Sequence, residues 1–87
     1  MNCALESYLE KEHENMREPR LGTIIVNCPI FGRQICYWCC LHVQDMSNPL
    51  TRPNAEVFNP RYKEVINKIR PDITLDGCWE TCSSCRK

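Results

Sequence analysis

The sequence predicts a small α+β fold, in which one β-hairpin with a cysteine turn at its end packs with two or three short helices. Three observations predict it. A β-branched segment, a Pro–Gly turn and a second apolar segment follow one another in residues 22–38. An amphipathic helix is expected after Asn59. Seven of the eight cysteines form two groups, one at 28–40 and one at 78–85.

The N-terminal residues 2–18 are expected to form a charged helix with a sparse apolar face, which Pro19 ends. We therefore divide the chain into a charged N-terminal helix or arm, residues 1–20, and a cysteine-rich metal-binding domain, residues 21–87. Cys3 lies in the arm, remote in sequence from both cysteine groups, and is expected to be a free thiol.

The hairpin is expected to consist of strands at 22–27 and 33–38, joined by a turn at 29–32. Residues 44–59 are polar and contain Pro49 and Pro53, so we expect a loop that connects the hairpin to the rest of the chain.

A helix is expected to begin with Asn59 as its N-cap and Pro60 at its first position, and Pro71 ends it. Its apolar face has the spacing of an α-helix. The residues of this face are Tyr62, Val65, Ile66 and Ile69. A final helix, capped at Asp76 and Gly77, would carry the last cysteine group.

Composition and charge limit the functions that we expect for this chain. The 87 residues are 43% hydrophobic with the cysteines counted, and 11 basic residues balance 11 acidic ones. Residues 1–14 are charged and lack the apolar segment of a signal peptide, and the longest apolar run, 35–41, is too short for a membrane span. We therefore expect a cytoplasmic protein with no membrane contact. In the reducing cytoplasm, cysteine clusters more often hold metals than form disulfides. Disulfides and free or catalytic thiols remain the alternatives.

The two cysteine groups have the spacing of metal ligands. Cys36 and Cys39 on a turn can present both sulfurs to one ion, and Cys82 and Cys85 form a second C-x2-C pair. The simplest assembly is therefore one four-thiolate zinc site. A second zinc ion, completed by His42 or by a shared sulfur, would use the cysteines that remain in the two groups. These are Cys28, Cys40 and Cys78.

Hairpin geometry limits which cysteines can share an ion. In a regular hairpin that closes at residues 30–31, Cys28 pairs with Arg33, and Cys36 lies three rungs further along, about 10 Å away. Thiolates on one zinc ion each lie about 2.3 Å from it. A regular hairpin therefore keeps Cys28 and Cys36 apart.

The two pairs, one on a turn and one on a helix, resemble treble-clef zinc fingers, in which a hairpin turn and a helix start share the ion. The run Cys78-x3-Cys82-x2-Cys85 is similar to the cysteine motif of radical SAM enzymes. That family places a large barrel after the motif and two residues follow here, so the enzyme is not expected. A [4Fe–4S] cluster on these three cysteines plus Cys39 or Cys40 is the alternative cofactor.

No catalytic set of residues can be assigned, and a four-thiolate zinc site leaves no open coordination position for chemistry. We expect a non-enzymatic zinc-binding module that mediates a protein–protein interaction in a regulatory or accessory role. The alternatives are an iron–sulfur electron-transfer subunit and a nucleic-acid-binding zinc finger. The balanced charge disfavours nucleic-acid binding. The basic residues available for nucleic acid are Arg52, Arg61, Lys63, Lys68 and Arg70.

Overall fold

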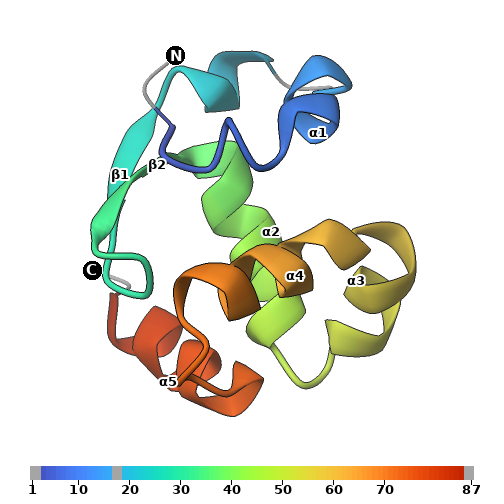
Figure 1. Ribbon diagram of the computed structural model, residues 1–87, viewed down its shortest axis with the longest axis vertical. Helices are drawn as coiled ribbons and strands as arrows, with labels where there is room; N and C mark the ends of the chain where they lie inside the picture. The colour runs from blue at the N-terminus through green and yellow to red at the C-terminus, as the bar shows by residue number, and fades with distance from the viewer. Residues whose placement is uncertain (1–2, 17–18, 86–87) are drawn as a thin grey trace.

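The computed structural model describes residues 3–16 and 19–85 and shows a two-stranded hairpin at one side of a group of short helices (Figure 1). The predicted α+β class is confirmed. The elements in chain order are α1 (Glu10–Glu14), the 3-10 helix η1 (Pro19–Gly22), β1 (Ile25–Cys28), β2 (Arg33–Cys36), α2 (Tyr37–Ser47), α3 (Arg52–Phe58), α4 (Pro60–Ile69) and α5 (Leu75–Cys85).

The hairpin has the predicted register, with Cys28 opposite Arg33 and Cys36 opposite Ile25. Gly32 closes the turn with a φ of 62°, a left-handed conformation that glycine adopts without steric cost. The second strand is shorter than expected. It ends at Cys36, and the chain turns directly into α2 at Tyr37, whose N–H donates to the carbonyl of Ile24 (2.8 Å).

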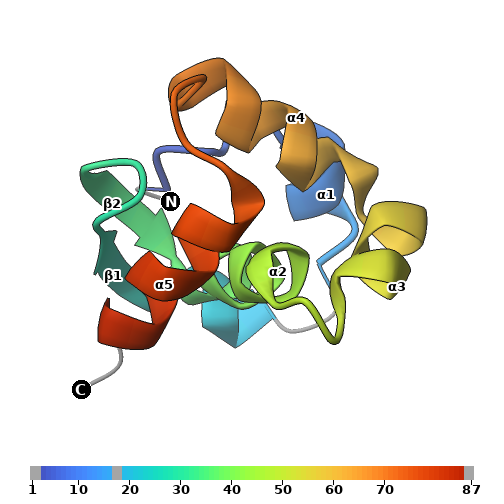
Figure 2. The same ribbon diagram turned by 90° about the horizontal axis from the view of Figure 1, so that it is seen from below.

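Helix α2 runs through the middle of the molecule, as Figures 1 and 2 show, and it contacts both strands and the helices α3, α4 and α5. Cys39, Val43 and Met46 are fully or almost fully buried along it. Ser47 at its end is also buried, and its hydroxyl donates to the carbonyl of Val43 (2.7 Å). A helix with neighbours on several sides needs no single apolar stripe, which is why its sequence shows little periodicity.

The prediction of a loop at residues 44–59 is wrong for most of these residues. Helix α2 continues to Ser47, and α3 occupies residues 52–58, so only residues 48–51 connect the two helices. Pro53 falls in the first turn of α3, where the missing N–H has no intrahelical partner to lose. Ala55 is the buried residue of this helix, and one small side chain gives no periodic apolar signal.

The N-terminal segment differs from the expected charged helix. Residues 4–8 form turns and α1 spans five residues; positions 2, 17 and 18 of the predicted helix lie outside the described residues. Leu5 and Leu9 are both completely buried. The N–H of Ala4 donates to the carbonyl of Gln34 on β2 (2.9 Å), which fixes the segment against the hairpin.

The two C-terminal helices are confirmed, but the cap expected at Asp76 and Gly77 is wrong. Helix α5 begins at Leu75, and the Gly77 N–H donates to Oγ1 of Thr74 (3.0 Å). Helix α4 buries Tyr62, Val65 and Ile66 on its predicted face. Helix α5 lies beside the hairpin and α2, as Figure 2 shows, and the Arg52–Asp76 pair (3.0 Å) joins it to α3. No helix within residues 3–16 and 19–85 has the length and apolar content that crossing a membrane requires.

Candidate metal centre

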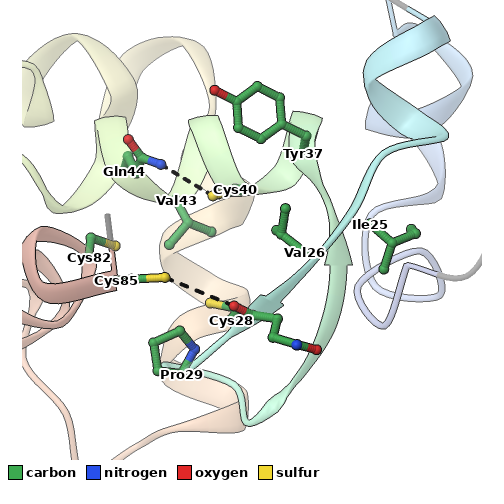
Figure 3. A pocket seen from close by; sticks show the side chains of 11 residues that line it. Ile25, Val26, Cys28, Pro29, Tyr37, Cys40, Val43, Gln44, Cys82 and Cys85 are labelled. Atoms are coloured by element: carbon green, nitrogen blue, oxygen red, sulfur yellow. Dashed lines mark hydrogen bonds between the residues drawn. The ribbon is translucent and has the colours of Figure 1, made fainter. Parts of the chain in front are cut away.

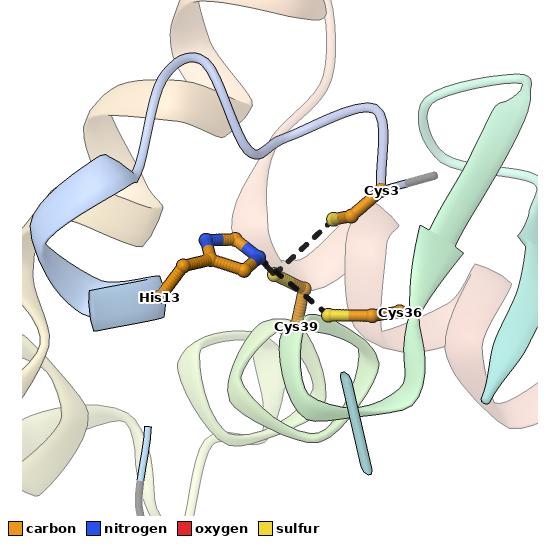
Figure 4. Close-up of side chains that lie close together, drawn as sticks. All are labelled: Cys3, His13, Cys36 and Cys39. Carbon is orange, nitrogen blue, oxygen red and sulfur yellow. Dashed lines mark hydrogen bonds between the residues drawn. The ribbon is translucent and has the colours of Figure 1, made fainter. Parts of the chain in front are cut away.

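Three thiols and one imidazole converge where the N-terminal segment meets the hairpin and α2 (Figure 4). These ligand atoms, from Cys3, His13, Cys36 and Cys39, all lie within 4.8 Å of one another. The Cys3 and Cys39 sulfurs are 3.6 Å apart, and Nε2 of His13 lies 3.6 Å from Cys36 Sγ and 3.5 Å from Cys39 Sγ. A tetrahedral zinc site with ordinary bond lengths has edges of about 3.8 Å between sulfurs and about 3.6 Å between sulfur and nitrogen. The group therefore has the size of a zinc site.

The Cys36–Cys39 pair is formed by the junction between β2 and α2. Cys36 is the last strand residue and keeps an extended backbone (φ −75°, ψ 156°), whereas Cys39 lies in the first turn of the helix. This change of direction brings both sulfurs to the same side. The N-terminus of a helix also favours negative charge, and therefore the thiolate forms that bind metal.

Cys3 is held in place by its neighbours in the turns of the N-terminal segment. The Ala4–Gln34 hydrogen bond attaches this segment to β2, and Leu5 is buried beside it. The Cys3 side chain is 7% exposed and faces the other two sulfurs. The sequence predicts a free thiol at Cys3 because no short motif connects it with the other cysteines, whereas the structure places it in this group.

His13 is the member of this group that no sequence pattern indicates. Its Nδ1–H donates to the carbonyl of Leu9 one turn earlier in the chain (2.8 Å), so Nε2 carries the lone pair that faces the sulfurs. A hydrogen bond of this kind to the second ring nitrogen is the usual way in which proteins fix the tautomer and orientation of a metal-binding histidine.

A second layer of contacts supports the group. The buried hydroxyl of Tyr62 on α4 donates to Cys39 Sγ (3.6 Å). Burial raises the pKa of Tyr62 well above its usual value, so the phenol remains a neutral donor. Outer hydrogen bonds of this kind orient ligands and tune metal affinity.

The thiols of this group perturb one another. Hydrogen bonds from Cys36 and Cys39 lower the pKa of Cys3, and the contact with Cys3 raises the pKa of Cys36 and Cys39. Without a cation, a thiolate at one sulfur therefore opposes loss of the protons from the other two. A Zn²⁺ ion bound by three thiolates and a neutral imidazole would displace those protons and leave a net charge of −1 on the site.

The second C-x2-C pair does not join this group. Cys82 and Cys85 on α5, with Cys28 and Cys40, line a separate pocket between α5, β1 and α2 (Figure 3). Burial raises the pKa of Cys28 and Cys40, and raises that of Cys82 to about 12.

Two further candidates lie elsewhere. Cys78 is fully buried in the apolar core, where desolvation raises its pKa. The His42 ring lies between Trp38 (4.7 Å) and Tyr62 (5.1 Å), half-buried and away from the cysteine pocket. All eight cysteines are free thiols in this structure.

Comparison with protein-family models, curated proteins and solved structures finds no match to this chain. The class of site is therefore defined by its own geometry. It is a three-cysteine, one-histidine group of zinc-like dimensions in a small α+β fold.

Proposed function

We propose that this chain is a zinc-binding module in which Cys3, His13, Cys36 and Cys39 hold one Zn²⁺ ion. The observation that carries the proposal is the compact spacing of one nitrogen and three sulfurs, which all lie within 4.8 Å of one another and of which three pairs lie 3.5 or 3.6 Å apart. Thiolate and imidazole ligands together suit zinc, which has no geometric preference of its own and accepts both. A [4Fe–4S] cluster is normally held by four thiolates around a larger body, so the spacing of this group favours a single ion.

The proposed ion has a structural role. Four protein ligands fill a tetrahedral coordination sphere, so no position remains for a water molecule or a substrate. The ion would join the segment that carries Cys3 and His13 to the hairpin end that carries Cys36 and Cys39. We therefore propose a non-enzymatic module, stabilised by zinc.

An interaction with a protein partner is the role that the surface supports best. Leu50, Val57 and Phe58, on and just before α3, are 88%, 73% and 77% exposed. Where such side chains form one continuous apolar patch, the patch is typical of a surface that another protein covers. Nucleic acid is less well supported because four of the five basic candidates pair with carboxylates. These pairs are Arg52–Asp76, Arg61–Glu64, Lys63–Glu56 and Arg70–Asp72.

Metal analysis of the purified protein tests the zinc proposal. We expect a colourless protein that contains zinc, and we expect Cys36→Ser/Cys39→Ser to lose one zinc ion per chain. Iron with acid-labile sulfide would contradict the proposal. So would a variant that retains all the zinc of the wild type.

Substitution of the exposed apolar residues tests the partner role. We expect Leu50→Ser/Val57→Ser/Phe58→Ser to retain its zinc and its melting temperature but to lose partners that copurify with the wild type. Ile24→Ser is a matched control, because Ile24 is an exposed apolar residue (48%) at a different place in the fold. Equal partner recovery from the wild type and the triple variant would contradict this role.

A further inference from the structure

A second cysteine cluster lines the pocket between β1, α2 and α5, which has a volume of about 610 Å³. Cys28 comes from β1, Cys40 from α2, and Cys82 and Cys85 from α5, so half of the chain's cysteines lie around one opening (Figure 3). Residues 28 and 85 are far apart in sequence and meet only because α5 packs beside the hairpin.

Packing alone explains Cys28, which is buried, but not the other three residues. Cysteine often serves as a small buried hydrophobe, and Cys78, which is fully buried, fits that description. In the pocket, however, Cys85 is exposed, and Cys40 and Cys82 are only half-buried. Their thiols therefore remain accessible to an ion from solvent.

The local structure directs the sulfurs into the same pocket. Cys40 follows Cys39 on α2, and a step of one residue turns the side chain by about 100°, so the two neighbours face different sites. Cys82 and Cys85 are three residues apart on α5 and share a face. The Cys85 sulfur lies 4.0 Å from the carbonyl oxygen of Asn27, beside Cys28.

A polar contact to one of these sulfurs resembles the outer shell of a metal site. The side-chain amide of Gln44, one turn further along α2, donates to Cys40 Sγ (3.2 Å). Amide donors to sulfur stabilise the thiolate form and orient it.

We propose that this pocket is a second zinc site, with Cys28, Cys40, Cys82 and Cys85 as its four thiolate ligands. Binding replaces four S–H bonds by four Zn–S bonds and releases four protons to solvent, which leaves a net charge of −2 on the site. Within the described ranges, the Cys3 group is the only one whose ligand atoms all lie within 4.8 Å of one another. Zinc would therefore have to draw the pocket sulfurs closer together, and rotation of a cysteine χ1 between staggered positions is the smallest movement that shifts a sulfur.

The proposed site would fix the C-terminal helix to the hairpin, as the Cys3 group would fix the N-terminal segment. The two ligand sets have no residue in common, so each proposed site can be removed by its own substitutions.

Native mass spectrometry of the full chain tests the proposal. We expect two zinc ions in the wild type and one in Cys82→Ser/Cys85→Ser. The matched control is Ser83→Ala/Ser84→Ala, which changes two exposed residues of the same turn and should retain both ions. A wild type that holds one zinc, with the same content in the Cys82/Cys85 variant, would overturn the proposal.

Failure of one site can be distinguished from failure of the other. If only the pocket binds zinc, the Cys82/Cys85 variant loses all of it and Cys36→Ser/Cys39→Ser retains it. If only the Cys3 group binds zinc, Cys36→Ser/Cys39→Ser loses all of it and the Cys82/Cys85 variant retains it. That result overturns the pocket proposal. Cobalt substitution gives an independent count, because thiolate charge-transfer absorption should correspond to seven bound thiolates in the wild type and three in the Cys82/Cys85 variant.

A measurement on the wild type avoids any folding defect of the variants. Cys85 is exposed, so without a metal its thiol should react readily with N-ethylmaleimide. We expect peptide mapping to show Cys85 protected in the native protein, and to show that a chelator abolishes the protection. Rapid modification of Cys85 in the zinc-loaded protein would overturn the proposal. A disulfide within the pocket, or iron and sulfide at these cysteines, would also overturn it.

Discussion

His13 connects the local structure of a short helix to the proposed metal centre. Helix α1 has five residues and buries none of them, so packing does not hold its side chains in place. The ring is positioned at one end by the carbonyl of Leu9 and at the other by the sulfurs of Cys36 and Cys39. Because Leu9 itself is completely buried, the orientation of the ligand depends on the core.

The two histidines of the chain allow a matched test of this role. We expect His13→Gln to weaken zinc binding at this centre by more than about 100-fold, because loss of a direct ligand should exceed the roughly 10–100-fold effect of outer contacts. His42→Gln should lower the affinity far less, because His42 contacts the rings of Trp38 and Tyr62 and no sulfur of the group. Competition with a chromophoric chelator measures both affinities. Equal losses in the two variants would contradict the assignment of His13.

Tyr62 permits a test of the outer hydrogen bond. Tyr62→Phe retains the buried ring and removes the donor to Cys39, so we expect zinc affinity to fall about tenfold while the fold is retained. Tyr8→Phe is the control, because the Tyr8 ring faces the ammonium group of Lys68 rather than the cysteine group. The same chelator competition measures both variants, and an unchanged affinity in Tyr62→Phe would exclude a role for the hydroxyl.

At the scale of elements, the sequence predicts those features that depend on interactions between residues close together in the chain. The register of the hairpin follows from its turn, and the bounds of α4 follow from Pro60 and an apolar face; both are confirmed, although Asn59 makes no side-chain capping hydrogen bond. The pairing of Cys36 with Cys39 is also local, since one turn of chain separates them. Helix α3 could not be predicted, because it packs one alanine against the core and has no periodic face.

The other two ligands of the centre depend on tertiary contacts. Cys3 is 36 residues from Cys39, and His13 is 23 residues from Cys36. They reach the centre because Leu5 and Leu9 are buried and Ala4 bonds to β2. None of these contacts has a short-range sequence motif, so the charged composition of residues 1–20 predicts a charged helix or arm instead.

The hairpin turn gives a prediction at this scale. Gly32 has a φ of 62°, and no atom lies within 4 Å of the position that a Cβ would occupy. Gly32→Ala should therefore be destabilised by backbone strain alone, by about 1–2 kcal/mol. Gly32→Asn should lose less, because asparagine tolerates this conformation. Thermal unfolding at a fixed excess of zinc measures the effect, and equal melting temperatures for the alanine and asparagine variants would contradict it.

At the scale of the whole molecule, the compact size does not imply a large reserve of stability. The radius of gyration is 11.8 Å, close to the value of about 12 Å expected for a folded chain of this length. Small domains have a net stability of roughly 5–15 kcal/mol, whereas a structural zinc ion contributes an apparent 10–16 kcal/mol. Loss of the ion would therefore remove as much free energy as the whole fold has in reserve.

Deletion of residues 1–20 tests this dependence directly. The deletion removes Cys3 and His13 as ligands and the buried side chains of Leu5 and Leu9. We expect it to abolish zinc binding at this centre and cooperative thermal unfolding, because two thiolates alone do not complete a tetrahedral site and the core is left open. Wild-type protein treated with a chelator shows how much of the loss of cooperative unfolding is due to the ion alone. If residues 21–87 retain a cooperative transition and the full zinc content, the segment is a dispensable arm and the centre does not depend on it.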